Sequence, residues 1–92
     1  MTMHSASGHT ERMNEINENA LRVIEELRSP LDTREYRDVL GLSQRDFAKL
    51  AGCDQAVIAR AERGVKELAP HYCLHARIAT WLLYPERVKG PV

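Results

Sequence analysis

The chain has 92 residues, 43% of them hydrophobic, and a formal net charge of zero. This length fits one small domain and a tail, and the balanced charge excludes a binder of nucleic acid that relies on electrostatics alone. No apolar run approaches a membrane span, the N-terminus lacks the apolar core of a secretion signal, and the two cysteines have no metal-motif or disulfide spacing. We therefore expect a cytoplasmic protein with no membrane partner and no cofactor.

The N-terminal third carries an acidic excess, with three Arg against five Glu in residues 1–29. Residues 1–10 are small and polar and predict a disordered arm. Residues 11–29 predict an amphipathic helix ended by Ser29-Pro30, with these residues on its apolar face: Ile16, Ala20, Val23 or Ile24, and Leu27. Three partners for that face stay open, namely its own domain, the same helix of a second copy, or a groove in another protein.

The next segment predicts a short helix with its own start and stop signals. Asp32 and Glu35 form a capping pair, and Gly41 ends the helix after Leu40. Its core-facing residues are expected to be Tyr36, Val39 and Leu40, and Leu42 is expected to pack beneath the helix that follows.

Two further helices are predicted on either side of a glycine turn. Ser43 caps the first, whose apolar residues are Phe47, Ala48, Leu50 and Ala51, and Gly52 closes it. Asp54 is the predicted cap of the second helix, Gly64 ends it, and its buried stripe is Val57, Ile58 and Ala61. The small residues Ala48 and Gly52 permit a close crossing of the two helices.

A connector over residues 65–69 leads into the last predicted helix. Pro70 stands at a favoured first helical position, and the helix is expected to run to Tyr84. Its predicted buried residues are Leu74, Ile78, Trp81 and Leu82. Residues 85–92 are expected to be a C-terminal tail after Pro85. The chain shows no convincing strand, so the predicted fold is all-α with five helices.

The stretch LGLSQRDFAKLAGCDQAVIARAERG resembles the lambda repressor-like (Xre/Cro) helix-turn-helix family. Its Ser-Gln pair, alanine, turn glycine, apolar core and terminal Glu-Arg-Gly fall in register together, and the resemblance covers residues 36–82. It implies a five-helix lambda repressor-like DNA-binding domain over residues 30–84, with the N-terminal helix as an addition. Cys53 stands where the family places a small apolar residue, so a buried free thiol is expected. Ala56 and Val57 depart from the Ser or Thr often found in the family.

The resemblance and side-chain chemistry together predict the DNA contacts. Gln55 can donate to and accept from one base edge, which favours adenine, whereas Arg60 can reach a base, a phosphate or an acidic group of its own domain. The predicted base contacts are Gln55, Ala56, Ala59 and Arg60; the predicted phosphate contacts are Gln44, Arg45, Lys49, Arg63 and Lys66. By resemblance, Gln44 also braces the residue that starts the recognition helix, and Glu62 pairs with a nearby arginine.

These features favour a sequence-specific transcriptional regulator that reads double-stranded DNA in the major groove through residues 55–63. Because Ala56 and Ala59 limit the readout by one subunit, we expect a homodimer, a repressor or autoregulator, on a repeated or palindromic operator. Two alternatives stay open: an antitoxin that binds a toxin and an operator, and an interaction adaptor that does not use DNA.

An enzyme is not expected, since no phosphate loop, Ser/His/Asp arrangement or nucleophile elbow is present. His71 and His75 share a helix face, but Cys73 between them points elsewhere, so the three cannot form one metal site.

Overall fold

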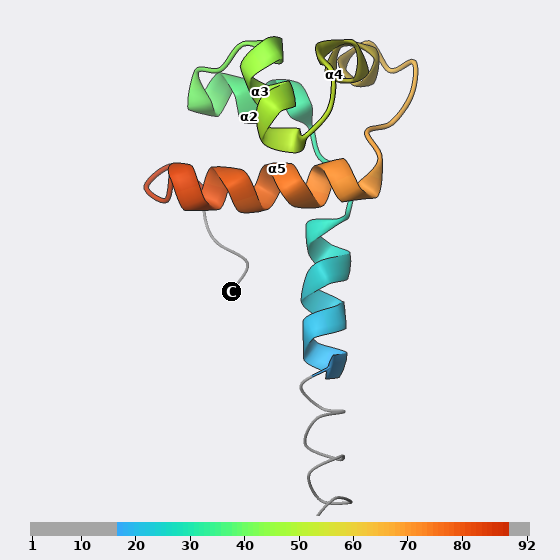
Figure 1. Cartoon of the computed structure of the whole chain (residues 1–92), viewed down its shortest axis with the longest axis vertical. Helices are drawn as coiled ribbons and strands as arrows, with labels where there is room; N and C mark the ends of the chain where they lie inside the picture. The colour runs from blue at the N-terminus through green and yellow to red at the C-terminus, as the bar shows by residue number, and fades with distance from the viewer. Residues whose placement is uncertain (1–16, 89–92) are drawn as a thin grey trace, which may run out of the picture.

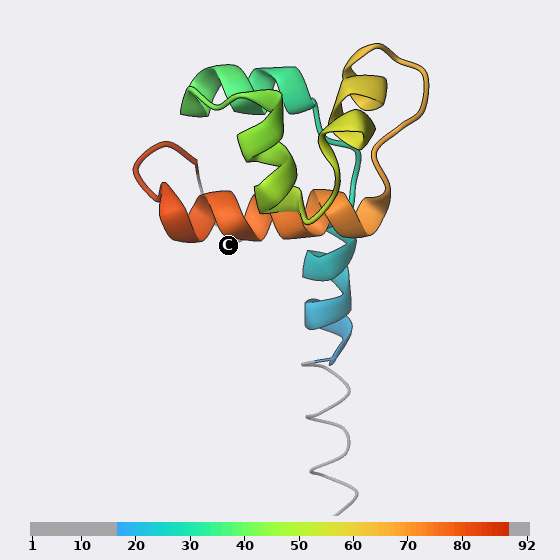
Figure 2. The ribbon, with the colours of Figure 1, turned by 45° about the horizontal axis from the view of Figure 1, so that its top comes forward.

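The computed structural model describes residues 17–88, and within them the chain is helical with no strand (Figures 1 and 2). Residues 17–27 are helical, and four helices follow: α2 (Thr33–Leu40), α3 (Gln44–Ala51), α4 (Gln55–Glu62) and α5 (Pro70–Leu83). The predicted all-α, five-helix fold is confirmed over this range. Residues 1–10, which are predicted to be disordered, the first part of the N-terminal helix and residues 89–92 lie outside the described residues.

The helix boundaries follow from local capping. The Asp32 carboxylate accepts the Glu35 backbone N–H at 3.1 Å, and the Ser43 hydroxyl accepts that of Asp46 at 3.1 Å, as predicted. Asp54 does occupy the N-cap position of α4, but its side chain makes no capping hydrogen bond. Its predicted capping role is therefore wrong in that respect.

The turn between α3 and α4 depends on a left-handed residue. Gly52 has φ +80°, and the Cys53 N–H returns to the Ala48 carbonyl at 3.0 Å, which closes α3 with a Schellman arrangement. Only glycine adopts this φ without a steric penalty from a Cβ atom. The turn lets α4 begin three residues later at a sharp angle to α3.

The hydrophobic core lies where α3 packs against both α4 and α5, while α2 packs against α4 (Figure 1). Phe47 is completely buried at its centre, and the Tyr36 ring lies 6.3 Å from the Phe47 ring. The buried alanines of α3 and α5 allow the two helices to approach closely. The core comprises Leu40, Phe47, Ala48, Ala51, Ile58, Leu68, Cys73 and Ala76.

The predicted buried face of α5 is wrong. Its buried residues are Cys73, Ala76 and Thr80, whereas Leu82 is 67% exposed and Trp81 is 37% exposed. Leu74 and Ile78 are only partly buried. The helix is apolar on several faces, so spacing alone could not select the one that packs on α3. Val39 in α2, also predicted to face the core, is 52% exposed.

The helical residues 17–27 project from the side of α5 opposite to α2, α3 and α4 (Figures 1 and 2). Leu21 is 61% exposed and Ile24 is 40% exposed, whereas Val23 and Leu27 are partly buried. Packing against its own domain therefore accounts for only part of the apolar surface of this helix. We name residues 17–27 the arm.

Two arginines connect the segments that flank α2 to α5 with these helices. The Arg77 guanidinium donates to the Leu27 carbonyl at 2.6 Å and to the Ser29 carbonyl at 2.7 Å, at the base of the arm. Arg87 donates to the Leu40 carbonyl at 3.1 Å, so the turn after α5 lies against the end of α2. Within residues 17–88, no helix is long and apolar enough to cross a membrane.

Candidate nucleic-acid interface

Helix α4 has one face in the core and one face in solvent. Ile58 is completely buried, and Val57 and Ala61 pack beside it, as predicted. The opposite face carries the predicted base contacts, Gln55, Ala56, Ala59 and Arg60, and the predicted phosphate contact Arg63 follows at the end of the helix. All of these are exposed except Ala59, which is partly buried. The solvent face therefore presents one amide, two methyl groups and two guanidinium groups.

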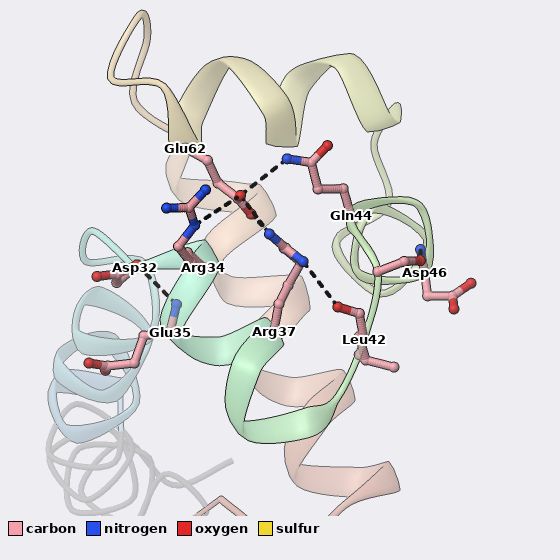
Figure 3. A network of polar contacts seen from close by, with 9 residues as sticks. Asp32, Arg34, Glu35, Arg37, Leu42, Gln44, Asp46 and Glu62 are labelled. Atoms are coloured by element: carbon pink, nitrogen blue, oxygen red, sulfur yellow. Dashed lines mark hydrogen bonds and ion pairs between the residues drawn. The ribbon is translucent and has the colours of Figure 1, made fainter.

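A buried ion pair holds the last turn of α4 in place (Figure 3). The Arg37 Nε donates to Glu62 Oε2 at 2.6 Å and its Nη2 donates to Oε1 at 2.7 Å, a bidentate contact between α2 and α4. The Glu62 side chain is only 3% exposed and that of Arg37 is 16% exposed. Arg34 adds a longer contact of 3.9 Å from an exposed position. The predicted ion pair of Glu62 is confirmed.

Sequence reasoning missed Arg37 as the partner. A signal was present, because Arg37 lies in the same helical stripe as Thr33 and Leu40, both buried. A charged residue in such a stripe requires a buried partner. The contacts of the Arg37 guanidinium continue past Glu62, since Nη1 donates to the Leu42 carbonyl at 3.2 Å, in the segment that enters α3.

The same contacts keep Glu62 ionised. The pKa of the Glu62 carboxyl is lowered from 4.5 to about 2, chiefly by the hydrogen bonds from the Arg37 guanidinium, with a smaller contribution from the Gln44 hydrogen bond and against the opposing effect of burial. The carboxylate in turn raises the pKa of Arg37. Both groups are charged at neutral pH, so the pair is a permanent connection among α2, the start of α3 and the end of α4.

Gln44 makes a different internal contact from the one expected. Its Nε2 donates to Glu62 Oε1 at 3.1 Å, so it braces the last turn of α4 and not Gln55 at its start (Figure 3). Because an amide NH₂ group has two donor hydrogens, one remains for an outside acceptor. The predicted contact between Gln44 and a DNA phosphate stays a prediction.

The predicted phosphate-binding cations surround α4 on neighbouring segments. Arg45 and Lys49 are exposed, four residues apart on one face of α3. Arg60 and Lys66 line one open groove of about 470 Å³ between the end of α4, the connector and the start of α5. Arg60, a predicted base contact, and Lys66, a predicted phosphate contact, therefore line the same groove.

The cysteines and histidines do not form a second site within residues 17–88. Cys53 is partly buried, so the prediction of a buried thiol holds only in part, and Cys73 is buried; both are free thiols, and burial raises the pKa of each. His71 and His75 are exposed with ring centroids 6.3 Å apart, whereas Cys73 faces the core. No cluster of three or more metal-binding side chains occurs in this part of the chain.

The capped helices, the left-handed glycine turn and the solvent face of α4 together form two helices joined at a sharp angle, with the second one open to solvent. A comparison with protein families agrees with this geometry, since residues 34–74 match the model of the helix-turn-helix family. The expected resemblance to a helix-turn-helix family is thus confirmed for residues 34–74, which are less than half of the chain. No curated protein and no solved structure matches the chain.

The helix-turn-helix is an element with which DNA-binding proteins read the major groove. The matched residues begin in α2 and end in α5, so they include the ion pair of Arg37 with Glu62 and all of α4. The arm lies outside them.

Proposed function

We propose that the chain is a sequence-specific transcriptional regulator, a repressor or autoregulator, that binds operator DNA as a homodimer. Gln55 and Arg60 on α4 contact base edges in the major groove, and Ala56 and Ala59 contact thymine methyl groups or leave room for the bases. Gln44, Arg45, Lys49, Arg63 and Lys66 hold the flanking phosphates.

The observation that carries this proposal is the division of α4 into two faces. The residues that hold α4 in the domain are Val57, Ile58, Ala61 and Glu62, and none of them is a reading residue. A helix end held in this way can enter a groove about 12 Å wide without giving up contacts inside the domain. The surrounding cations on α3 and the connector supply the complementary charge.

A selection of bound sequences from random DNA duplexes tests this function. The full chain is expected to enrich one motif in two copies, with half-sites about one helical turn apart or a multiple of it. An adenine is expected in each half-site opposite Gln55. Recovery of unselected sequence with no common motif would contradict the proposal.

Lys49 gives a test of the phosphate contacts. The variant Lys49→Ala is expected to weaken binding to the operator and to unrelated duplexes alike, because a phosphate contact carries no sequence information. Its plot of log affinity against log salt concentration should be shallower by about 1. The variant Lys89→Ala, in the predicted tail, is the matched control. A loss confined to the operator would assign Lys49 to base readout.

A further inference from the structure

The arm presents apolar surface that its own domain leaves open. Leu21 and Ile24 are among the exposed large hydrophobic residues, although they lie on a helix with charged residues on its other side. Removal of these two side chains from water is favourable, so the exposed apolar side of the arm favours contact with a partner.

The arm fits a heptad pattern over its whole described length. With Asn17 at position a, the core positions are Asn17 and Ile24 at a and Ala20 and Leu27 at d, and the flanking e and g positions are Leu21 and Val23. Every charged residue falls on the outer b, c and f positions: Glu18, Arg22, Glu25 and Glu26. A β-branched residue at a with leucine at d favours two parallel strands, and asparagine at a fixes their register. The pattern thus indicates a second copy of the same helix.

The orientation of the arm agrees with a parallel pair. The arm leaves α5 on the side away from α4 (Figures 1 and 2), so parallel arms place both domains at one end with both copies of α4 pointing away from the pair. An antiparallel pair would send the two α4 helices to opposite ends, where they could not share one short operator.

Arg77 fixes the direction in which the arm leaves the domain. Its guanidinium donates to four consecutive or nearly consecutive carbonyls, those of Glu26, Leu27, Ser29 and Pro30, at distances of 2.6 to 3.3 Å. A cation is also favourable at this end of a helix, where carbonyls lack partners and the helix dipole is negative. The arm is consequently joined to α5 through a defined joint.

We propose that the arm pairs in parallel with the arm of a second copy, as a short two-stranded coiled coil that makes the chain a dimer. This proposal rests on the DNA-binding function for the choice of the parallel orientation. The coiled coil places two reading helices on one side of the dimer, and the Arg77 joints set the angle between them.

Sedimentation equilibrium of the full chain tests the pairing. The variant Ile24→Glu places a charge at the central a position and is expected to weaken self-association by at least ~100-fold. Arg22→Glu changes more charge on the same helix, but at an outer f position, and is expected to remain dimeric. Because Ile24 lies outside the core, both variants should keep the circular dichroism melting curve of α2 to α5. A monomeric wild-type chain, or a dimer unaffected by Ile24→Glu, overturns the proposal.

Disulfide cross-linking tests the direction. Ala20→Cys and Leu27→Cys, one heptad apart at d positions, are each expected to form a covalent dimer under mild oxidation, and Arg22→Cys and the wild-type chain are not. In an antiparallel pair, Ala20 and Leu27 cannot both lie opposite the same residue of the second copy. Cross-linking at only one of the two positions therefore overturns the parallel arrangement. A chain that cross-links at both positions but binds no DNA retains the coiled coil and refutes the proposed function. A chain that binds its operator but forms neither cross-link retains the proposed function and refutes the coiled coil.

Discussion

The variant Arg37→Met is expected to lower the free energy of unfolding by about 3 kcal/mol or more, a large part of the stability of a small domain. The loss arises because Glu62, with a side chain only 3% exposed, keeps its charge without its bidentate partner. Urea denaturation followed by circular dichroism measures the change. Arg34→Met is the matched control, since Arg34 is 73% exposed at 3.9 Å from Glu62 and should cost under about 0.5 kcal/mol.

A second substitution separates the lost pair from lost packing. The double variant Arg37→Met with Glu62→Leu leaves no unpaired charge in the interior, and it should recover much of the stability lost by Arg37→Met alone. If the double variant is no more stable than the single one, the cost of Arg37→Met comes from packing and not from the buried charge.

The pair also predicts how stability depends on pH. The pKa of Glu62 falls from 4.5 to about 2 in the folded state, so its contribution is complete above about 4.5 and is lost as the pH falls toward 2. The contribution amounts to roughly 3 kcal/mol. Glu62→Gln should therefore show a weaker loss of stability between pH 4.5 and 2 than the wild-type chain. Parallel curves for the two proteins over this window would contradict the assignment.

The double variant Gln55→Ala with Arg60→Ala is expected to lower affinity for the selected operator by about 100-fold or more, because each well-formed base contact contributes about 1–3 kcal/mol of discrimination. Both side chains are exposed and outside the core, so the thermal midpoint should be unchanged. Fluorescence anisotropy with operator and scrambled duplexes at one salt concentration measures the effect.

The scrambled duplex provides the contrast for this variant. Affinity for it should fall only several-fold, owing to the lost Arg60 charge. His71→Ala, at an exposed position on α5, should bind both duplexes like the wild-type chain. An equal loss on both duplexes would show that these residues contact the backbone and do not read bases.

Local signals predicted the helices well because each boundary depends on residues next to it. Ser43, Gly52 and Pro70 mark starts and stops through hydrogen bonds or backbone angles within one turn. The core of α3 and α4 was also predictable, since the large apolar residues of each helix fall on one face. The same holds for the solvent face of α4 and hence for the candidate reading residues.

Long-range contacts were not predictable in the same way. In α5, apolar residues occur on several faces, and only the shape of α3 selects Cys73, Ala76 and Thr80 for burial. The partners of Glu62 and Arg77 lie 25 and about 50 positions away in the sequence. Asp54 shows that a local prediction can also fail. It occupies the N-cap position of α4, as predicted, but its side chain makes no capping hydrogen bond.

A double-mutant cycle between Gln55 and its base tests most directly whether α4 reads DNA. The first change in the cycle is Gln55→Ala. The second change replaces the facing adenine of the operator by 7-deazaadenine, which lacks the major-groove N7 acceptor but still pairs with thymine. If Gln55 donates to that nitrogen, either change alone weakens binding, and the two together weaken it hardly more than one. Fully additive losses at every adenine of the operator would contradict base readout by α4.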